Sequence, residues 1–141
     1  MDKIDYDIVQ ENGEFVVREG KTKYRVDLRK RLLQFAVDTI NFLGTLPYRK
    51  EFDVFRYQLS KSSTSMGANY EESQGGYSYR DFASKIGICY KEARETHYFY
   101  KVIHSLQIGD LNVCKRLTNE SDELKRIFGS ILSKVKNAGD K

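Results

Sequence analysis

The chain has 141 residues, of which 40% are hydrophobic and 31% are charged, so we expect one domain with one core rather than a two-domain enzyme. Residues 1–20 carry a net charge of −4, whereas residues 21–141 carry +8, an excess that favours attraction to polyanions. No segment has the apolar length of a signal peptide or of a membrane-spanning helix. We therefore expect a cytoplasmic protein without a membrane partner.

Residues 1–22 form an acidic extension that differs in pattern from the rest of the chain. Short runs of β-branched and aromatic residues lie on either side of Asn12-Gly13. Asn-Gly is a favoured pair for a type I′ turn, because both residues must adopt positive φ. The pattern indicates a short β-hairpin, and an acidic, partly ordered tail is the alternative.

From residue 23 to residue 137 the apolar period becomes helical and predicts a bundle domain of four helices. In the first helix the core positions are spaced by four and three residues, and Gly44 and Pro47 end it. These positions are Leu28, Leu32, Phe35, Thr39, Phe42 and Leu46. Three further apolar residues, Leu33, Val37 and Ile40, widen this face, so we expect the helix to contact more than one neighbour.

The other three helices follow the same rhythm. The second runs from Phe52 to Tyr70, the third starts at a capping box formed by Ser78 and Asp81, and the fourth follows Gly109-Asp110. Short connections between amphipathic helices favour an all-α, antiparallel, up-and-down bundle. The expected core residues are Leu28, Leu32, Phe35, Phe55, Leu59, Ile86, Leu117, Leu124 and Ile131. Cys89 and Cys114 lack the spacing of a metal or redox site and are expected to be buried thiols.

The second and third helices carry a pattern of polar and apolar residues that resembles a known family. Its members here are Ser62, Ser65, Asn69, Glu72, Asp81 and Phe82. Together with Ile86-Gly87-Ile88 and Glu92 to Glu95, this pattern resembles the four-helix-bundle proteins encoded in intervening sequences of bacterial 23S ribosomal RNA. Their superfamily includes the accessory variability protein of diversity-generating retroelements. The resemblance covers roughly residues 24–136.

The resemblance implies a left-handed up-and-down bundle, assembly into a homopentamer, and no known catalytic activity. For the retroelement relative it implies binding to nucleic acid and to a reverse transcriptase. The chain departs from the family pattern at two positions. Gly67 stands where the family usually has a proline, and Ser73 stands where it has a glycine.

The strip formed by Ser62, Ser65, Asn69 and Glu72 lies on one helix face and has two interpretations. In the first, serine and asparagine hydrogen-bond within tightly packed helices while Glu72 caps or pairs near the helix end. In the second, small residues allow close approach between subunits, and Asn69 sets their register. We favour a structural or assembly role over a ligand site.

The sequence shows no pattern typical of an enzyme or of a metalloprotein. A di-metal bundle site needs Glu-x-x-His on two helices, and neither His97 nor His104 completes that motif. Walker and Gly-x-Ser-x-Gly patterns are also missing. We therefore expect no catalytic residues, no metal site and no cofactor.

Basic side chains carry the remaining functional signal, and some of them alternate with tyrosines such as Tyr90, Tyr98 and Tyr100. Cations and aromatic rings together suit a single-stranded DNA or RNA surface. The expected contacts are Arg29, Lys30, Arg31, Arg56, Lys91 and Arg94. We therefore predict a non-enzymatic, oligomeric, nucleic-acid-binding accessory or scaffold protein. The alternative is a protein-interaction module, for example a partner of a reverse transcriptase, that does not bind nucleic acid itself.

Overall fold

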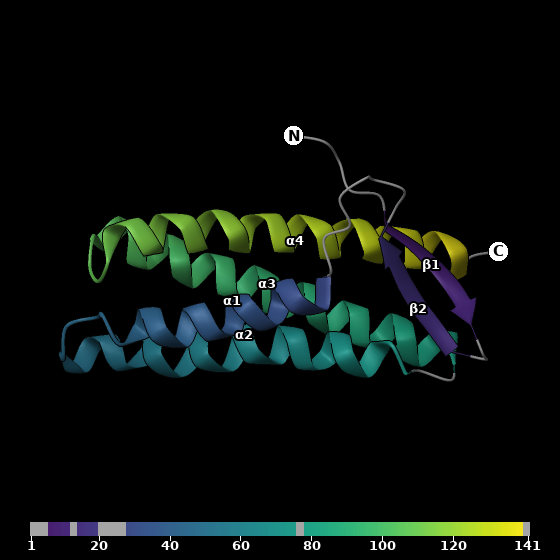
Figure 1. Ribbon diagram of the computed structural model, residues 1–141, viewed down its shortest axis with the longest axis horizontal. Coiled ribbons are helices and arrows are strands. Elements are labelled where there is room, and N and C mark those ends of the chain that lie inside the picture. The colour runs from purple at the N-terminus through teal and green to yellow at the C-terminus, as the bar shows by residue number, and fades with distance from the viewer. Residues whose placement is uncertain (1–5, 12–13, 20–27, 76–77, 140–141) are drawn as a thin grey trace.

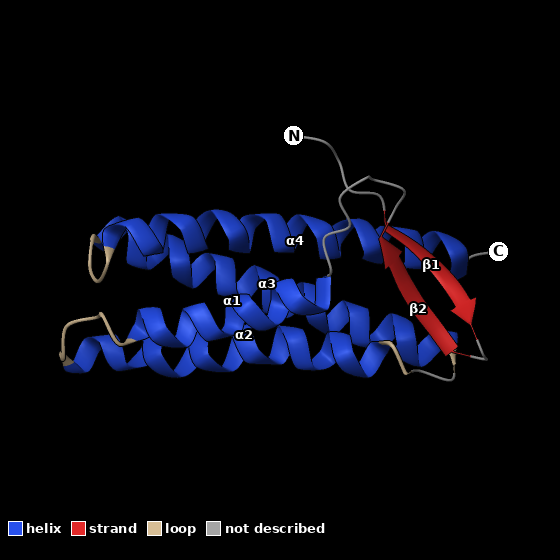
Figure 2. Cartoon of the chain, in the orientation of Figure 1, coloured by secondary structure: helices blue, strands red, loops and turns tan. Residues whose placement is uncertain are grey.

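A computed structural model describes residues 6–11, 14–19, 28–75 and 78–139 (Figure 1). Four α-helices form an elongated bundle, and a two-stranded hairpin lies at one of its ends (Figure 2). The helices are α1 (Leu28–Leu43), α2 (Asp53–Ser73), α3 (Tyr79–Leu106) and α4 (Leu111–Gly139). A short 3₁₀ helix, η1 (Lys50–Phe52), precedes α2, and the strands are β1 (Tyr6–Glu11) and β2 (Glu14–Glu19).

Consecutive helices are antiparallel neighbours, so the up-and-down prediction is confirmed. The start of α3 contacts the end of α2 through the pair Lys85–Glu72, and it contacts the end of α4 where Tyr79 donates a hydrogen bond to the Val135 carbonyl. Helices α2 and α4 each pack extensively on α3, whereas α1 packs mainly on α2 and only lightly on α4. Helix α1 therefore lies diagonally opposite α3.

The predicted core forms as expected. All nine residues that the sequence places in the core are buried, and so are both cysteines. The stripe on α3 is buried along its whole length: Phe82, Ile86, Cys89, Ala93, Thr96, Tyr100 and Ile103. Since the helical period brings these positions onto one side, burial of that side holds α3 between α2 and α4.

The hairpin prediction is confirmed for the described strands. Ile8 pairs with Val17, and Glu11 pairs with Glu14, which leaves two residues between the strands. The Asn12-Gly13 turn itself lies outside the described residues. Helix α1 has 16 residues against 29 for α4, so it leaves one end of the bundle uncovered. The hairpin packs against that end of α4 (Figure 1).

The opposite end of the bundle depends on a close contact between two loops. Gly109 has a φ of +75°, and a side chain there would come within 3.0 Å of Leu46 and Thr45. Glycine alone adopts this conformation without strain or crowding. The Thr45 hydroxyl also accepts a hydrogen bond from the Asp110 backbone amide, at 2.9 Å. The loop after α3 is thereby fixed against the loop after α1.

None of the helices, over the residues described, combines the length and the apolar character needed to cross a membrane.

Candidate nucleic-acid interface

Exposed cations and a tyrosine follow one face of α3 with the 3-4-3 spacing of a helix: Lys91, Arg94, Tyr98 and Lys101. Tyr98 is 58% exposed. Within the described part of the chain, none of the three cations lies within 4.0 Å of a carboxylate oxygen. We call these four residues the α3 row. Its positive charge is not neutralised by those residues, so it is available to an anionic ligand.

A packed aromatic ring supports the middle of the α3 row. The Arg94 guanidinium lies over the Tyr90 ring, 5.7 Å from its centre, in cation–π geometry. Tyr90 in turn lies against Gly129 of α4, where an added side chain would come within 3.2 Å of the ring. Gly129 thus gives Tyr90 room to lie against α4, and Tyr90 holds Arg94 at the edge where α3 meets α4.

Helix α4 adds a second group of cations beside this row. Lys115, Asp122 and Arg126 share a face of α4, and Lys125 lies next to them. Asp122 is paired with Lys125 at 3.2 Å and with Arg126 at 3.0 Å. We call the α3 row together with Lys115, Asp122, Lys125 and Arg126 of α4 the α3–α4 face.

His97 of α3 lies at the centre of the α3–α4 face. Its Nδ1 is 3.3 Å from Lys125 Nζ, and its Nε2 is 3.8 Å from an Asp122 oxygen. Burial lowers the pKa of His97, and the charge of Lys125 lowers it further, against the opposing effect of Asp122. The imidazole is therefore neutral at pH 7 and adds no charge to the surface there.

The acidic side chains of α3 lie off the α3 row. Glu92 and Glu95 are one position away from Lys91 and Arg94, toward α2. Burial raises the pKa of Glu92, and the neighbouring charge of Glu95 raises it further. Among the described residues, neither carboxylate forms an ion pair with a cation of the α3 row.

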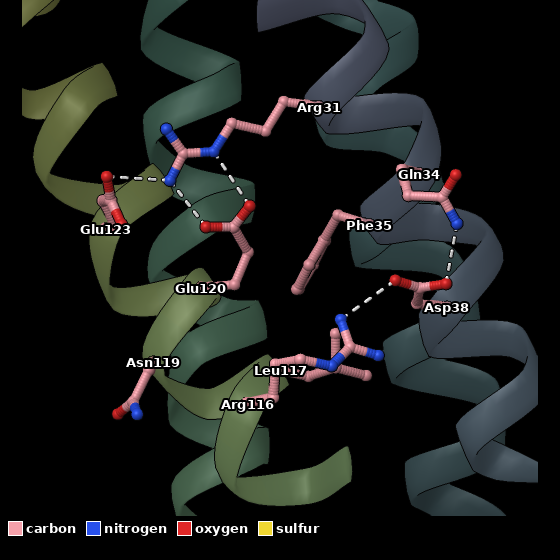
Figure 3. A pocket seen from close by; sticks show the side chains of 9 residues that line it. All are labelled: Arg31, Gln34, Phe35, Asp38, Arg116, Leu117, Asn119, Glu120 and Glu123. Atoms are coloured by element: carbon pink, nitrogen blue, oxygen red, sulfur yellow. Dashed lines mark hydrogen bonds and ion pairs between the residues drawn. The ribbon is translucent and has the colours of Figure 1, made fainter. Parts of the chain in front are cut away.

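Arg31 lies elsewhere than the exposed cluster that the sequence suggested. Its guanidinium donates hydrogen bonds of 2.8 and 2.6 Å to the two carboxylate oxygens of Glu120, and it lies 2.9 Å from Glu123 (Figure 3). Only 13% of its side chain is exposed. Hydrogen bonds to Glu120 raise the pKa of Arg31 despite its burial. Arg31 therefore joins α1 to α4 and is not a free phosphate contact.

A groove of about 470 Å³ surrounds this bridge between α1 and α4 (Figure 3). A second ion pair, between Arg116 and Asp38 at 3.1 Å, crosses the groove further along the two helices. The groove is lined by five charged residues, and each of them is engaged in one of these two ion-pair groups. Helices α1 and α4 are thus joined here mainly by charge, which agrees with their light packing.

Arg56 is also engaged within the fold. It donates hydrogen bonds to the Leu46 and Pro47 carbonyls, and its guanidinium lies over the Tyr48 ring. These contacts secure the loop that follows α1. Arg29 is half exposed and pairs with Glu71 of α2 at 3.4 Å, and Lys30 is exposed beside it.

The six predicted contacts therefore do not form one surface. Arg29 and Lys30 lie on α1, whereas Lys91 and Arg94 lie on the diagonally opposite α3. Sequence analysis did not assign Lys115, Lys125 or Arg126 to the interface. The signal that could have found them is the four-three spacing on α4 combined with antiparallel pairing to α3. Tyr100, which the pattern of cations and tyrosines grouped with this surface, lies on the apolar stripe of α3 and is fully buried.

The polar strip of α2 makes contacts within its own chain. Ser62 is buried, and its Oγ lies 2.8 Å from the Thr96 hydroxyl of α3. Glu72 pairs with Lys85 of α3 at 2.6 Å. The Asn69 side chain donates to the Ser65 carbonyl within α2. For Ser62 and Glu72, these contacts support the interpretation as links within the bundle.

Asp81 and Phe82 begin α3. The Asp81 backbone amide donates to Ser78 Oγ at 3.0 Å, as the capping-box prediction requires. Phe82 is fully buried beneath it. Among the described residues, no group of three or more histidine, cysteine, aspartate or glutamate side chains could hold a metal ion.

The helices that carry this surface match the family model for 23S rRNA-intervening sequence proteins over residues 25–130. The chain belongs to this family. No curated protein matches the chain. The family model ends before the C-terminal turns of α4, and the hairpin of this family member lies wholly outside it.

A solved structure supports both the family and the fold. It is a protein of unknown function from the S23 ribosomal protein family of Bacteroides thetaiotaomicron, 29% identical in sequence, with a TM-score of 0.67. The match covers 75% of this chain and 98% of that one. This 23S rRNA-intervening sequence protein therefore has the same bundle fold as the relative, almost all of which is matched. A quarter of the present chain lies outside the match.

Proposed function

We propose that the protein is a non-enzymatic accessory or scaffold protein that binds single-stranded RNA or DNA through the α3–α4 face. The observation that carries this proposal is the α3 row, in which three cations without counter-charges among the described residues flank an exposed tyrosine. Phosphate groups pair with such cations, and unpaired bases stack on aromatic rings without sequence preference.

We further propose that the protein works as a homo-oligomer assembled through the opposite side of the bundle. On α1, Leu33 is 67% exposed, and Val37 and Ile40 are each 46% exposed. Leu33 also borders a largely apolar groove between α1 and α2, whose lining includes the small residues Ala36, Gly67 and Ala68. Contact between subunits through this side would leave the α3–α4 face of every subunit accessible to nucleic acid. The positive charges of several subunits would then attract the same nucleic-acid strand.

The test is the binding of a 20-nucleotide single-stranded RNA, and of the same sequence as DNA, measured by fluorescence anisotropy at 100 mM KCl. The variant Lys91→Gln/Arg94→Gln/Lys101→Gln removes three positive charges from the α3 row. We expect it to lose about tenfold or more in affinity, because it loses up to three phosphate contacts.

A matched control, Lys30→Gln/Lys50→Gln/Lys61→Gln, removes the same charge from exposed positions on α1, η1 and α2. We expect it to lose less than about threefold, since only the long-range field changes. Equal losses in the two variants, or no binding by the unmodified protein, would contradict the proposal.

A protein partner in place of nucleic acid is the second candidate, and the exposed apolar side chains of α1 favour it. Binding driven by apolar contact tolerates salt, whereas phosphate binding weakens steeply as salt rises. The same titration at 50 and 200 mM KCl distinguishes the two.

A further inference from the structure

The α3–α4 face contains a carboxylate that contacts the cations a phosphate group would use. Asp122 lies 3.2 Å from Lys125 Nζ, 3.0 Å from Arg126 Nε and 3.8 Å from His97 Nε2. Among the described residues, the ion pairs of Lys125 and Arg126 both go to this one side chain. Two cations of α4 thus pair with one carboxylate, and an imidazole of α3 lies beside it.

We propose that this cluster is a phosphate-binding position for the nucleic-acid backbone, and that Asp122 occupies it as a built-in competitor when no ligand is bound. This inference rests on the proposed function of the α3–α4 face. A non-bridging phosphate oxygen accepts from the same donors as a carboxylate oxygen, so Lys125, Arg126 and His97 serve either anion. Asp122 moves aside when the phosphate binds.

The surroundings fit an exchange of this kind. Arg126 is 76% exposed and Asp122 is 30% exposed, so a ligand can reach the position from solvent. Arg126 is the more exposed of the two partners, and ion pairs of exposed side chains are weak, so that contact costs little to break. Partial burial opposes ionisation of Asp122, but hydrogen bonding to Lys125 and the charge of Arg126 outweigh it and lower its pKa. The competitor is therefore anionic at neutral pH.

The position also lies beside the middle of the α3 row, because His97 falls between Arg94 and Lys101 on α3. Lys101 is four residues beyond His97 on α3, and its charge acts on the imidazole together with those of Lys125 and Arg126. A backbone that follows Lys91, Arg94 and Lys101 therefore passes beside the cluster. Phosphates of one strand can therefore occupy both the row and the position held by Asp122 beside it.

The test compares Asp122→Asn with the unmodified protein, using the same 20-nucleotide single-stranded RNA. Asparagine keeps the size of the side chain and removes its charge, so Lys125 and Arg126 lose their ion pairs with residue 122. We expect about three- to tenfold tighter binding and a steeper salt dependence. The slope of log K against log salt should grow by about 0.7 for each additional phosphate group that the protein binds.

Asp53→Asn is the matched control, because Asp53 is an exposed aspartate paired with Arg56 three residues away, on α2. It changes the net charge equally, and we expect less than a twofold effect. A third protein, Asp122→Asn/Arg126→Gln, also lacks the Arg126 cation with which Asp122 pairs. The increase in affinity from Asp122→Asn should largely disappear in this background. Melting temperatures of all variants verify that each is folded at the temperature of the binding assay.

Equal increases in affinity in Asp122→Asn and Asp53→Asn would overturn the inference, because net charge alone would explain them. Unchanged or weaker binding by Asp122→Asn would overturn it as well. If the α3-row variant loses binding while Asp122→Asn has no effect, the proposed function stands and this inference fails. If the unmodified protein binds neither RNA nor DNA, both fail.

Discussion

Tyr100 shows how a single polar atom is satisfied inside this bundle. Its hydroxyl donates a 2.7 Å hydrogen bond to Thr39 Oγ1, across from α3 to α1. The rings of Phe35 and Phe42 surround it at 5.9 and 5.7 Å between centres. Burial raises the pKa of Tyr100, so the hydroxyl stays protonated and its role is structural. This contact joins the two diagonal helices through the core.

Removing that hydroxyl tests its contribution. Tyr100→Phe leaves the buried Thr39 oxygen without its partner, and we expect a loss of about 1–2 kcal/mol in the free energy of unfolding, measured by urea denaturation. The double variant Tyr100→Phe/Thr39→Val replaces both polar groups with apolar ones and should be more stable than the single variant. A single variant as stable as the unmodified protein would contradict this role.

At the scale of single residues, the sequence predicts burial well and charge partners poorly. The helical period identified every core position on α3, because burial depends mainly on spacing within one helix. Arg31 and Lys91 look alike as exposed cations in the sequence. Arg31 is held by Glu120, 89 residues away, whereas Lys91 has no ion-pair partner among the described residues. A partner on another helix cannot be recognised without the helix packing.

At the scale of secondary-structure elements, a buried glutamine side chain at the end of α2 holds the hairpin. Gln74 is 7% exposed, and its Oε1 accepts from the Val17 backbone amide at 2.9 Å. Its Nε2 donates to the Ser73 hydroxyl, which donates in turn to the Tyr70 carbonyl. Ser73 stands where the family resemblance places a glycine. This departure from the family pattern thus lies at the site where the hairpin docks, and the hairpin itself is outside the family match.

We expect Gln74→Ala to release the hairpin while leaving the bundle folded. The Val17 amide loses a partly buried hydrogen bond, so its hydrogen exchange should accelerate, with a cost of about 1 kcal/mol or more in the local opening free energy. Gln34→Ala, at an exposed glutamine on α1, is the control and should leave hairpin exchange unchanged. Unaltered exchange at Val17 in Gln74→Ala would show that Gln74 does not hold the hairpin.

The hairpin also marks the limit of what local patterns predict about an element. The Asn12-Gly13 pair and the flanking β-branched residues predicted two strands, and the structure has them. Its docking site was not predictable, because it depends on how far α1 extends relative to α2 and α4. Helix α4 has 29 residues and α1 has 16, so α1 does not reach one end of the core. The hairpin covers that end.

For the whole molecule, the arrangement of the helices places the exposed apolar residues of α1 and the α3 row on different sides. The order of packing places α1 and α2 on one side and α3 and α4 on the other (Figure 1). Exposed apolar side chains lie on the first side, and the cations of the α3 row lie on the second. Self-association through the apolar side would therefore not compete with a polyanion for the basic side.

Light scattering tests this self-association. We expect the unmodified protein to have a mass several times the 16.4 kDa of one chain, about five times for the pentamer that the family resemblance implies. Leu33→Gln/Ile40→Gln should lower the mass, because both apolar side chains leave the contact. Leu106→Gln/Leu111→Gln, at similarly exposed residues near the loop after α3, should keep it. A 16.4 kDa unmodified protein would contradict the proposal.

The central claim is that phosphate groups bind the α3 row, and the salt dependence of RNA binding tests it most directly. Anisotropy titrations of the 20-nucleotide RNA between 50 and 200 mM KCl give the slope of log K against log salt. We expect a slope that is about 2 units shallower for Lys91→Gln/Arg94→Gln/Lys101→Gln than for the unmodified protein, since each single-strand phosphate contact contributes about 0.7. Identical slopes for the two proteins would contradict the claim.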